Sequence, residues 1–160
     1  MKNAQSHPGP AYTVNPQWRV GIVASSFYKE ERDAMVEGAQ SVFAEAGMAQ
    51  KNITVHYAAG SFEVPLIGCA LAEAGKVDAL LGLGIILQGE THHAELLAEQ
   101  AARGIMDVQL RFGIPFAFEV LFAQDMDLLK ERVFGEKNKG KEAAHAVLHS
   151  LAKLQSIRSR

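Results

Sequence analysis

The sequence predicts an α/β fold in which helices cover both faces of a four-stranded parallel sheet. Four short apolar or β-branched runs alternate along the chain with longer stretches whose apolar residues recur at helical spacing. Parallel neighbours need a crossover long enough to hold a helix, so this alternation favours a parallel sheet. With 160 residues, 48% of them hydrophobic, the chain has the size of one compact domain.

The first half of the chain supplies two strands and one helix. Residues 19–25 (RVGIVAS) form a continuous β-branched run, as expected of a buried strand. Residues 30–46 carry their apolar side chains on one helical face, and Gly47 ends that helix. Residues 53–57 (ITVHY) alternate as a second strand. Residues 1–17 have no such periodicity and hold three prolines, so we expect a flexible N-terminal arm, mobile or loosely docked, before a single domain at 18–160.

Glycine and proline mark the boundaries of the next elements. Pro65 fits the first turn of a helix at 65–74, where a missing N–H costs nothing. The run ALLGLGIIL at 79–87 is typical of a central strand covered on both faces. The remaining elements are a helix at 91–112, a strand at 116–122, and helices at 126–133 and 141–155.

Composition argues against several functional classes. The 16 Lys and Arg residues against 18 Asp and Glu give a formal net charge of -2, which disfavours a nucleic-acid binder with a basic surface. No apolar run approaches the roughly 18 residues of a membrane span, and residues 1–20 hold no apolar leader. We therefore expect a cytoplasmic protein. Cys69 stands alone, so no intrachain disulfide can form.

Charge is unevenly distributed along the chain. Residues 1–129 hold 8 basic and 15 acidic side chains, whereas residues 130–160 hold 8 basic and 3 acidic ones. The last fifth of the chain therefore carries a net positive charge. It either meets an anionic ligand, docks on the acidic part of a neighbour, or forms a solvated basic helix face.

The segment GIILQGETHH at 84–93 follows the third strand, at the sheet edge where ligands of parallel sheets bind. Its glycine spacing approaches that of a phosphate-binding P-loop, but Glu90 occupies the place of the lysine and would repel phosphate. Two interpretations remain. One is an anion site at the free N–H groups of a helix N-terminus, and the other is a tight turn with Thr91 as the N-cap.

His92 and His93 are expected in the first turn of the helix after this segment. Adjacent helical residues point about 100° apart, so the pair does not have the i, i+4 spacing of a zinc site. The helix dipole disfavours an imidazolium at this end, so we expect a neutral histidine that acts as general acid/base. Phe27 and Phe118 either stack on a planar ligand or belong to the core.

Five segments carry a family resemblance. They are Phe27, GSFEVP at 60–65, GLGIILQGETHH at 82–93, IPFAFEVL at 114–121, and Arg132 followed by NKG at 138–140. Together they resemble the lumazine synthase family of riboflavin biosynthesis, in order from about residue 18 to residue 155. The resemblance implies a flavodoxin-like three-layer sandwich, and pentamers that in some members stack as decamers or close into icosahedral shells.

The resemblance also implies a reaction. A transferase of this family condenses 5-amino-6-(D-ribitylamino)uracil with 3,4-dihydroxy-2-butanone 4-phosphate, without a metal or redox cofactor, in a site between two subunits. His93 aligns with the family's catalytic acid/base. The implied substrate-binding residues are Phe27, Ser61, Phe62, Glu63, Ile85, Ile86, Leu87, Phe118 and Lys139. The implied phosphate-binding residues are Glu90, Thr91 and Arg132, and Phe118, Arg132 and Lys139 are expected from the next subunit.

This chain departs from the family pattern at four positions. Many relatives carry arginine at Gln88, glycine at Glu119, and threonines at Phe122 and Ala123. A buried Glu119 needs a partner that the sequence does not identify. The alternative to an active synthase is therefore a diverged paralogue that binds lumazine or flavin, or forms a shell, without turnover.

Overall fold

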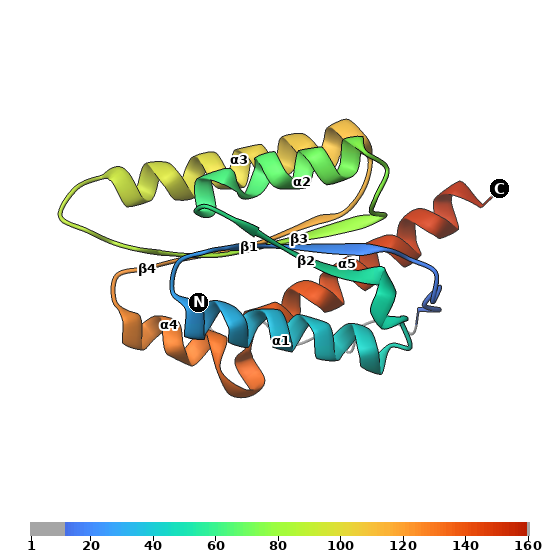
Figure 1. Cartoon of the computed structure of the whole chain (residues 1–160), viewed down its shortest axis with the longest axis horizontal. Coiled ribbons are helices and arrows are strands. Elements are labelled where there is room, and N and C mark those ends of the chain that lie inside the picture. The colour runs from blue at the N-terminus through green and yellow to red at the C-terminus, as the bar shows by residue number, and fades with distance from the viewer. Residues whose placement is uncertain (1–11, 160) are drawn as a thin grey trace.

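Four parallel strands form the sheet, which lies between two layers of helices (Figure 1). The order of the strands is β2-β1-β3-β4. The computed structural model describes residues 12–159. The strands are β1 (Val20–Ser25), β2 (Ile53–Ala58), β3 (Ala79–Leu87) and β4 (Phe116–Ala123). The predicted four-stranded parallel sheet is thus confirmed, with each expected strand within one residue of the observed bounds. From β1 the chain adds β2 on one side and then returns to add β3 on the other, so the order reverses between β1 and β3.

Helices cover both faces of the sheet (Figure 1). The helices are α1 (Lys29–Glu45), α2 (Val64–Glu73), α3 (His93–Phe112), α4 (Met126–Val133) and α5 (Lys139–Arg158). One layer holds α2 and α3, and the other holds α1, α4 and α5. Short 3-10 turns at residues 50–52, 61–63 and 135–137 were not expected from the sequence.

The sheet separates two apolar cores. β3 lies between β1 and β4, and eight of its nine residues are buried, as a continuous apolar run predicts. Side chains alternate along each strand, so Val120 of β4 packs against the α2–α3 layer while Leu121 packs against the α1–α5 layer. The cores hold the strands rigidly, which fixes the positions of the loops at their carboxyl ends.

Asn138 ties α1, α4 and α5 together. Its side-chain Nδ2 donates to the carbonyl oxygens of Val133, at 2.6 Å, and Ala34, at 2.8 Å. Its Oδ1 accepts from the N–H of Lys141 at 3.1 Å and so caps α5. This cap lets α5 begin at residue 139 instead of the expected 141. Gly140 allows the close approach, since a Cβ there would overlap the carbonyl oxygen of Met35.

The first described residues lie against the core. Tyr12 and Val14 pack against the apolar cluster of the α1–α5 layer, and the remainder of the expected arm, residues 1–11, lies outside the described residues. Between residues 12 and 159, no helix has the length and apolar character to cross a membrane.

We predict that Gly140→Ala destabilises the protein. The added methyl group would meet the backbone of Met35, which cannot move without shifting α1, so we expect a loss of about 3 kcal/mol in the free energy of unfolding. Urea titration would measure the loss. Gly89→Ala is the matched control, because a Cβ added there would have no other heavy atom within 4 Å. Equal stability of the two variants would contradict the close contact of α1 and α5.

Candidate active site

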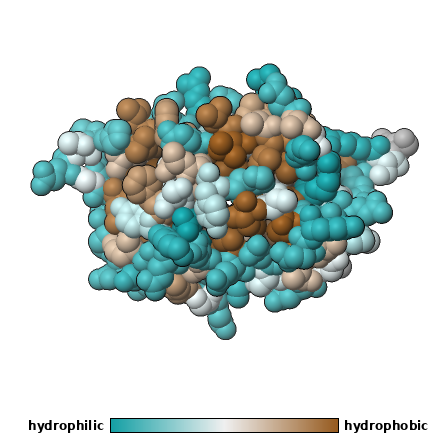
Figure 2. All heavy atoms as spheres, in the orientation of Figure 1, coloured by the Kyte–Doolittle hydropathy of each residue, from teal (hydrophilic) through white to brown (hydrophobic). Residues whose placement is uncertain are grey.

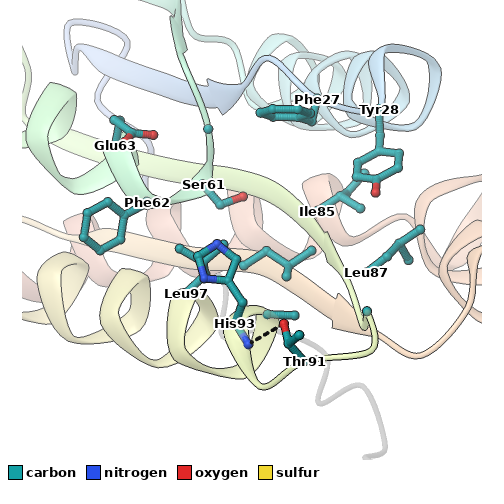
Figure 3. A pocket seen from close by; sticks show the side chains of 14 residues that line it. Phe27, Tyr28, Ser61, Phe62, Glu63, Ile85, Leu87, Thr91, His93 and Leu97 are labelled. Carbon is teal, nitrogen blue, oxygen red and sulfur yellow. Dashed lines mark hydrogen bonds between the residues drawn. The ribbon is translucent and has the colours of Figure 1, made fainter.

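A cavity of about 440 Å³ opens beyond the carboxyl ends of the strands, where the strand order reverses (Figure 3). Because β1 and β3 lead away to opposite sides of the sheet, the loops that follow them leave a crevice between them. The cavity is lined by the residues after β1 and β2, the end of β3, and the start of α3. Nine of the residues singled out in the sequence line it: Phe27, Ser61, Phe62, Glu63, Ile85, Ile86, Leu87, Thr91 and His93.

Two aromatic rings flank the cavity. The side chains of Phe27, after β1, and Phe62, after β2, lie on different sides of it (Figure 3). Phe27 is 62% exposed and Phe62 is 54% exposed. Exposed rings of this size indicate a binding surface, because apolar area left in water forgoes the free energy of burial. A planar ligand could cover the face of either ring.

The two adjacent histidines have different environments. His93 is the first residue of α3, and its imidazole points into the cavity toward Ser61 (Figure 3). His92 was expected in the first helical turn, but it is the N-cap residue of α3. Its side chain is 96% exposed, and its Nδ1 lies 3.2 Å from Oε2 of Glu95. Of the two, His93 is the histidine that can reach a ligand in the cavity.

Ser61 presents an unused hydroxyl group beside the cavity. The residue is 6% exposed, and its Oγ is buried without a hydrogen-bond partner among the described residues. Gly84 of β3 makes room for it, since a Cβ there would lie 2.5 Å from this oxygen. A buried hydroxyl without a partner costs free energy, which a ligand's donor or acceptor could recover.

The turn before α3 keeps backbone N–H groups available. The helix has no side-chain cap at His92, and the hydroxyl of Thr91 accepts from the N–H of His93 at a long 3.4 Å. The side-chain amide of Gln88 donates to the carbonyl oxygens of Gly89, at 3.1 Å, and Thr91, at 3.3 Å. Gln88 therefore holds two carbonyl oxygens of the turn, and the N-cap residue is His92 instead of Thr91. An anion site at this helix N-terminus stays a prediction.

Four of the expected site residues do not line this cavity. Glu90 is exposed on the turn between two lining residues. Phe118 lies on β4 and is 43% exposed, and Arg132 is exposed on α4. Lys139 begins α5, where it pairs with Glu142. The cavity of one chain therefore contains the expected histidine and Phe27 but not the expected arginine and lysine.

The cavity also has lining residues to which the sequence assigned no role. Tyr28 follows Phe27 and has a left-handed backbone with φ of 51°, a conformation that side chains other than Asn and Asp seldom adopt. Leu97 stands four residues after His93, on the same face of α3, so helical spacing could have identified it. Gly60, Gly89 and Ala94 complete the lining.

Glu119 is a half-buried carboxyl group on β4. Burial raises its pKa to about 7, while the positive charge of Lys139 opposes that rise and the negative charge of Glu142 adds to it. The nearby cation that the sequence could not identify is thus Lys139, at the start of α5.

Comparisons with known proteins agree on one family. The family model described as 6,7-dimethyl-8-ribityllumazine synthase matches residues 17–155. A protein of that name from Deinococcus deserti is 38% identical over 149 residues, which cover 92% of this chain and 95% of that protein. One from Levilactobacillus brevis is 35% identical over 140 residues, covering 87% and 89%. Another, from Ruthia magnifica subsp. Calyptogena magnifica, is 34% identical over 145 residues, covering 87% of each.

We predict that Glu119 lowers the stability of the protein as the pH rises. Its pKa in the folded state is about 7, above its ordinary value of 4.5, so the folded state binds the proton more tightly. The stabilisation of the folded state by the protonated Glu119 carboxyl is complete below about pH 4.5 and is lost as the pH passes 7. Relative to Glu119→Gln, the native chain should lose roughly 1–3 kcal/mol across this window.

Urea unfolding of the native chain and Glu119→Gln at several pH values would measure this difference. Glu99→Gln, on the exposed part of α3, is the control and should follow the native profile. If the Glu119→Gln profile also runs parallel to the native one, Glu119 is not held with a raised pKa.

Proposed function

The chain belongs to the 6,7-dimethyl-8-ribityllumazine synthase family, and we propose that it condenses 5-amino-6-(D-ribitylamino)uracil with 3,4-dihydroxy-2-butanone 4-phosphate. It is accordingly a transferase of riboflavin biosynthesis. The observation that carries the proposal is the cavity itself. It combines an exposed aromatic ring, a histidine and a helix N-terminus, which suit a planar amine, proton transfer and a phosphate group.

The aminouracil would bind against Phe27. Its planar ring can stack on the exposed phenyl ring, and the end of β3 at residues 85–87 offers an apolar floor. The ribityl chain carries several hydroxyl groups that need partners once they leave water. The unpartnered hydroxyl of Ser61 and the carboxylate of Glu63 line the same wall and can supply them, with Phe62 alongside.

The phosphorylated substrate would bind at the start of α3. Backbone N–H groups at Glu90 and Thr91, together with the helix dipole, favour a doubly charged anion there. Arg132 of a neighbouring subunit would complete the site with a charge-assisted hydrogen bond. This role also explains why basic residues predominate in the last fifth of the chain.

His93 would move protons during the condensation. The substrate amine attacks the C2 ketone, and water leaves to give an imine. Loss of the C3 proton then expels phosphate from C4 and leaves an enol, which tautomerises to a ketone at C3. The second nitrogen attacks this ketone, and a second water leaves as the ring closes. Each step transfers protons without net oxidation or reduction, so we propose that no metal or redox cofactor takes part. Holding both reactants together can contribute up to roughly 7–11 kcal/mol, and a general acid/base adds about a hundred- to ten-thousandfold in rate.

We propose that the working site forms between copies of the chain. Phe118, Arg132 and Lys139 lie outside the cavity of their own chain, and a second copy could bring them to it. Large apolar side chains are exposed elsewhere, including Leu66 at 66% and Leu110 at 74%, and Figure 2 shows apolar residues gathered over α2. Such surface favours burial against other copies, in a pentamer or a larger shell built from pentamers.

We also propose that the protein works in the cytoplasm. Its substrates under this proposal are a phosphate ester and a polyol, and membranes retain such polar metabolites where they are made.

Mixing the two substrates with the purified protein at micromolar concentration tests the proposed function. We expect the fluorescence of 6,7-dimethyl-8-ribityllumazine to appear with release of one phosphate for each turnover. Pure oligomer that binds the aminouracil and forms no product would instead indicate a diverged paralogue without turnover.

Substitution of the paired histidines should separate their roles. His93→Ala should lower kcat by about a hundred- to ten-thousandfold, because general acid/base catalysis contributes that much. His92→Ala is the matched control and should change kcat by less than about twofold, since its side chain points away into solvent. Steady-state kinetics would measure both, and the opposite ranking would show that His93 is not the acid/base.

Arg132→Ala should act mainly on the KM for the phosphorylated substrate, since it removes a binding contact and no proton carrier. Reassembling a mixture of His93→Ala and Arg132→Ala subunits tests whether the site is shared. Mixed oligomers contain junctions with both side chains intact. With the phosphorylated substrate held well below the KM of Arg132→Ala, the activity of the mixture should therefore exceed that of either variant alone. A mixture no more active than its components would place both residues in one subunit's site.

A further inference from the structure

Arg32 of α1 is a buried cation outside the cavity. Its side chain is 9% exposed. Its Nε and Nη2 donate to Oδ1 of Asp33 at 2.9 and 2.7 Å, and its Nη1 donates to the carbonyl oxygen of Ser26 at 3.3 Å. The guanidinium also lies over the ring of Tyr57, 4.6 Å from its centre. Burying a guanidinium is costly unless such partners are present, so these contacts fix its position.

These contacts hold the turn that carries Phe27. Ser26 is fixed on three sides, because its N–H and its hydroxyl both donate to the carbonyl oxygen of Ala58, at 2.9 and 2.7 Å, while its own carbonyl accepts from Arg32. On the far side of Phe27, the carbonyl oxygen of Tyr28 accepts from the backbone N–H of Arg32 at 2.8 Å. The guanidinium of Arg32 therefore contacts the turn before Phe27, while the contact after Phe27 is a backbone bond of the first helical turn that any residue at position 32 would make.

The turn needs such support. Tyr28 has the unfavourable left-handed backbone described above, and a conformation of this kind persists only where its surroundings impose it. The ring of Phe27 is 62% exposed, so packing of the ring itself constrains it little. The direction of the ring depends chiefly on the backbone of residues 26–28.

We propose that Arg32 is a positioning residue, which holds the ring of Phe27 over the cavity so that it can stack on the aminouracil. The inference rests on the proposed function, because it takes the aminouracil as the planar ligand. Arg32 itself does not line the cavity and acts through the turn. Tyr57 and Ala58 belong to the end of β2, so the same contacts also set the turn against the segment that carries Ser61 and Phe62.

Arg32→Met tests the proposal with little risk to the fold. Methionine keeps the apolar length of the side chain and suits a helix. Asp33 is not left alone, since Nζ of Lys29 lies 2.7 Å from its other oxygen, and that hydrogen bond is the foremost cause of its lowered pKa. Arg32→Lys is a second variant that keeps the charge but loses the planar fork that reaches Asp33 and Ser26 together.

Arg19 supplies a matched control. Its Nε and Nη2 donate to the two oxygens of Asp78, and its Nη1 donates to the carbonyl oxygen of Gly75. Like Arg32, it thus binds one carboxylate and one backbone carbonyl, although its side chain is 45% exposed. Arg19 precedes β1 at the amino ends of the strands, whereas the cavity lies at their carboxyl ends. Arg19→Met therefore removes a similar ion pair at a distance from the turn.

The readout is the Kd for the aminouracil, measured by calorimetry without the phosphorylated substrate. Arg32→Met and Arg32→Lys should each raise this Kd by about tenfold, while Arg19→Met should leave it within about twofold. The KM for the phosphorylated substrate should stay within about twofold in all three variants. A general loss of structure would instead weaken the binding of both substrates.

A double-mutant cycle with Phe27→Ala decides whether Arg32 acts through the ring. In the Phe27→Ala background, Arg32→Met should change the Kd by less than about twofold, because there is no ring left to position. An equal effect in both backgrounds would overturn the proposal, as would a native chain that does not bind the aminouracil. A native chain that binds the aminouracil but forms no lumazine would refute the proposed function. The double-mutant cycle would then still test whether Arg32 positions the ring of Phe27.

Discussion

The site exists because the strand order reverses between β1 and β3. The chain leaves β1 toward β2 on one side of the sheet and later returns to place β3 on the other, so the segments after these two strands diverge. The crevice between them needs no special residues to form. It fixes which segments can meet, namely the Phe27 turn, the Ser61 segment and the start of α3. The chemistry proposed for the protein depends on that geometry.

Hydrogen-bonding groups are used differently at the site and in the scaffold. Asn138 satisfies its side-chain amide by joining three helices. By contrast, the hydroxyl of Ser61 and Oε1 of Gln88 are buried without a partner among the residues that the structure describes, and α3 begins without a side-chain cap. A fold optimised for stability alone would satisfy these groups, so leaving them free is consistent with a ligand that does so.

Local pattern predicted the elements well and the long-range contacts poorly. The apolar run of β3, the proline at the start of α2 and the glycine after α1 are signals that lie within or beside the elements they mark. The strand and the two helices predicted from them are confirmed.

The proximity of Glu119 to Lys139 depends on how α5 lies against β4, which no local pattern specifies. The burial of Arg32 could not be predicted either, because a charged residue in a helix is expected on the surface. Only the tertiary structure shows that Tyr57 lies beside it. Nine cavity residues were expected because they stand in motifs that resemble the lumazine synthase family. The resemblance gave no role to Tyr28, and its left-handed backbone has no signal in residue type.

The position of the basic residues argues that the proposed chemistry requires association. Arg132 and Lys139 follow β4, and β3 separates β4 from β1, whose end carries Phe27. Strands in a sheet lie about 4.8 Å apart, so Phe27 and the elements after β4 flank the crevice across two strand spacings. The cavity of one chain lacks Arg132 and Lys139, so under the proposed function a second chain would have to supply them. The apolar surface that a single chain exposes would favour such an association.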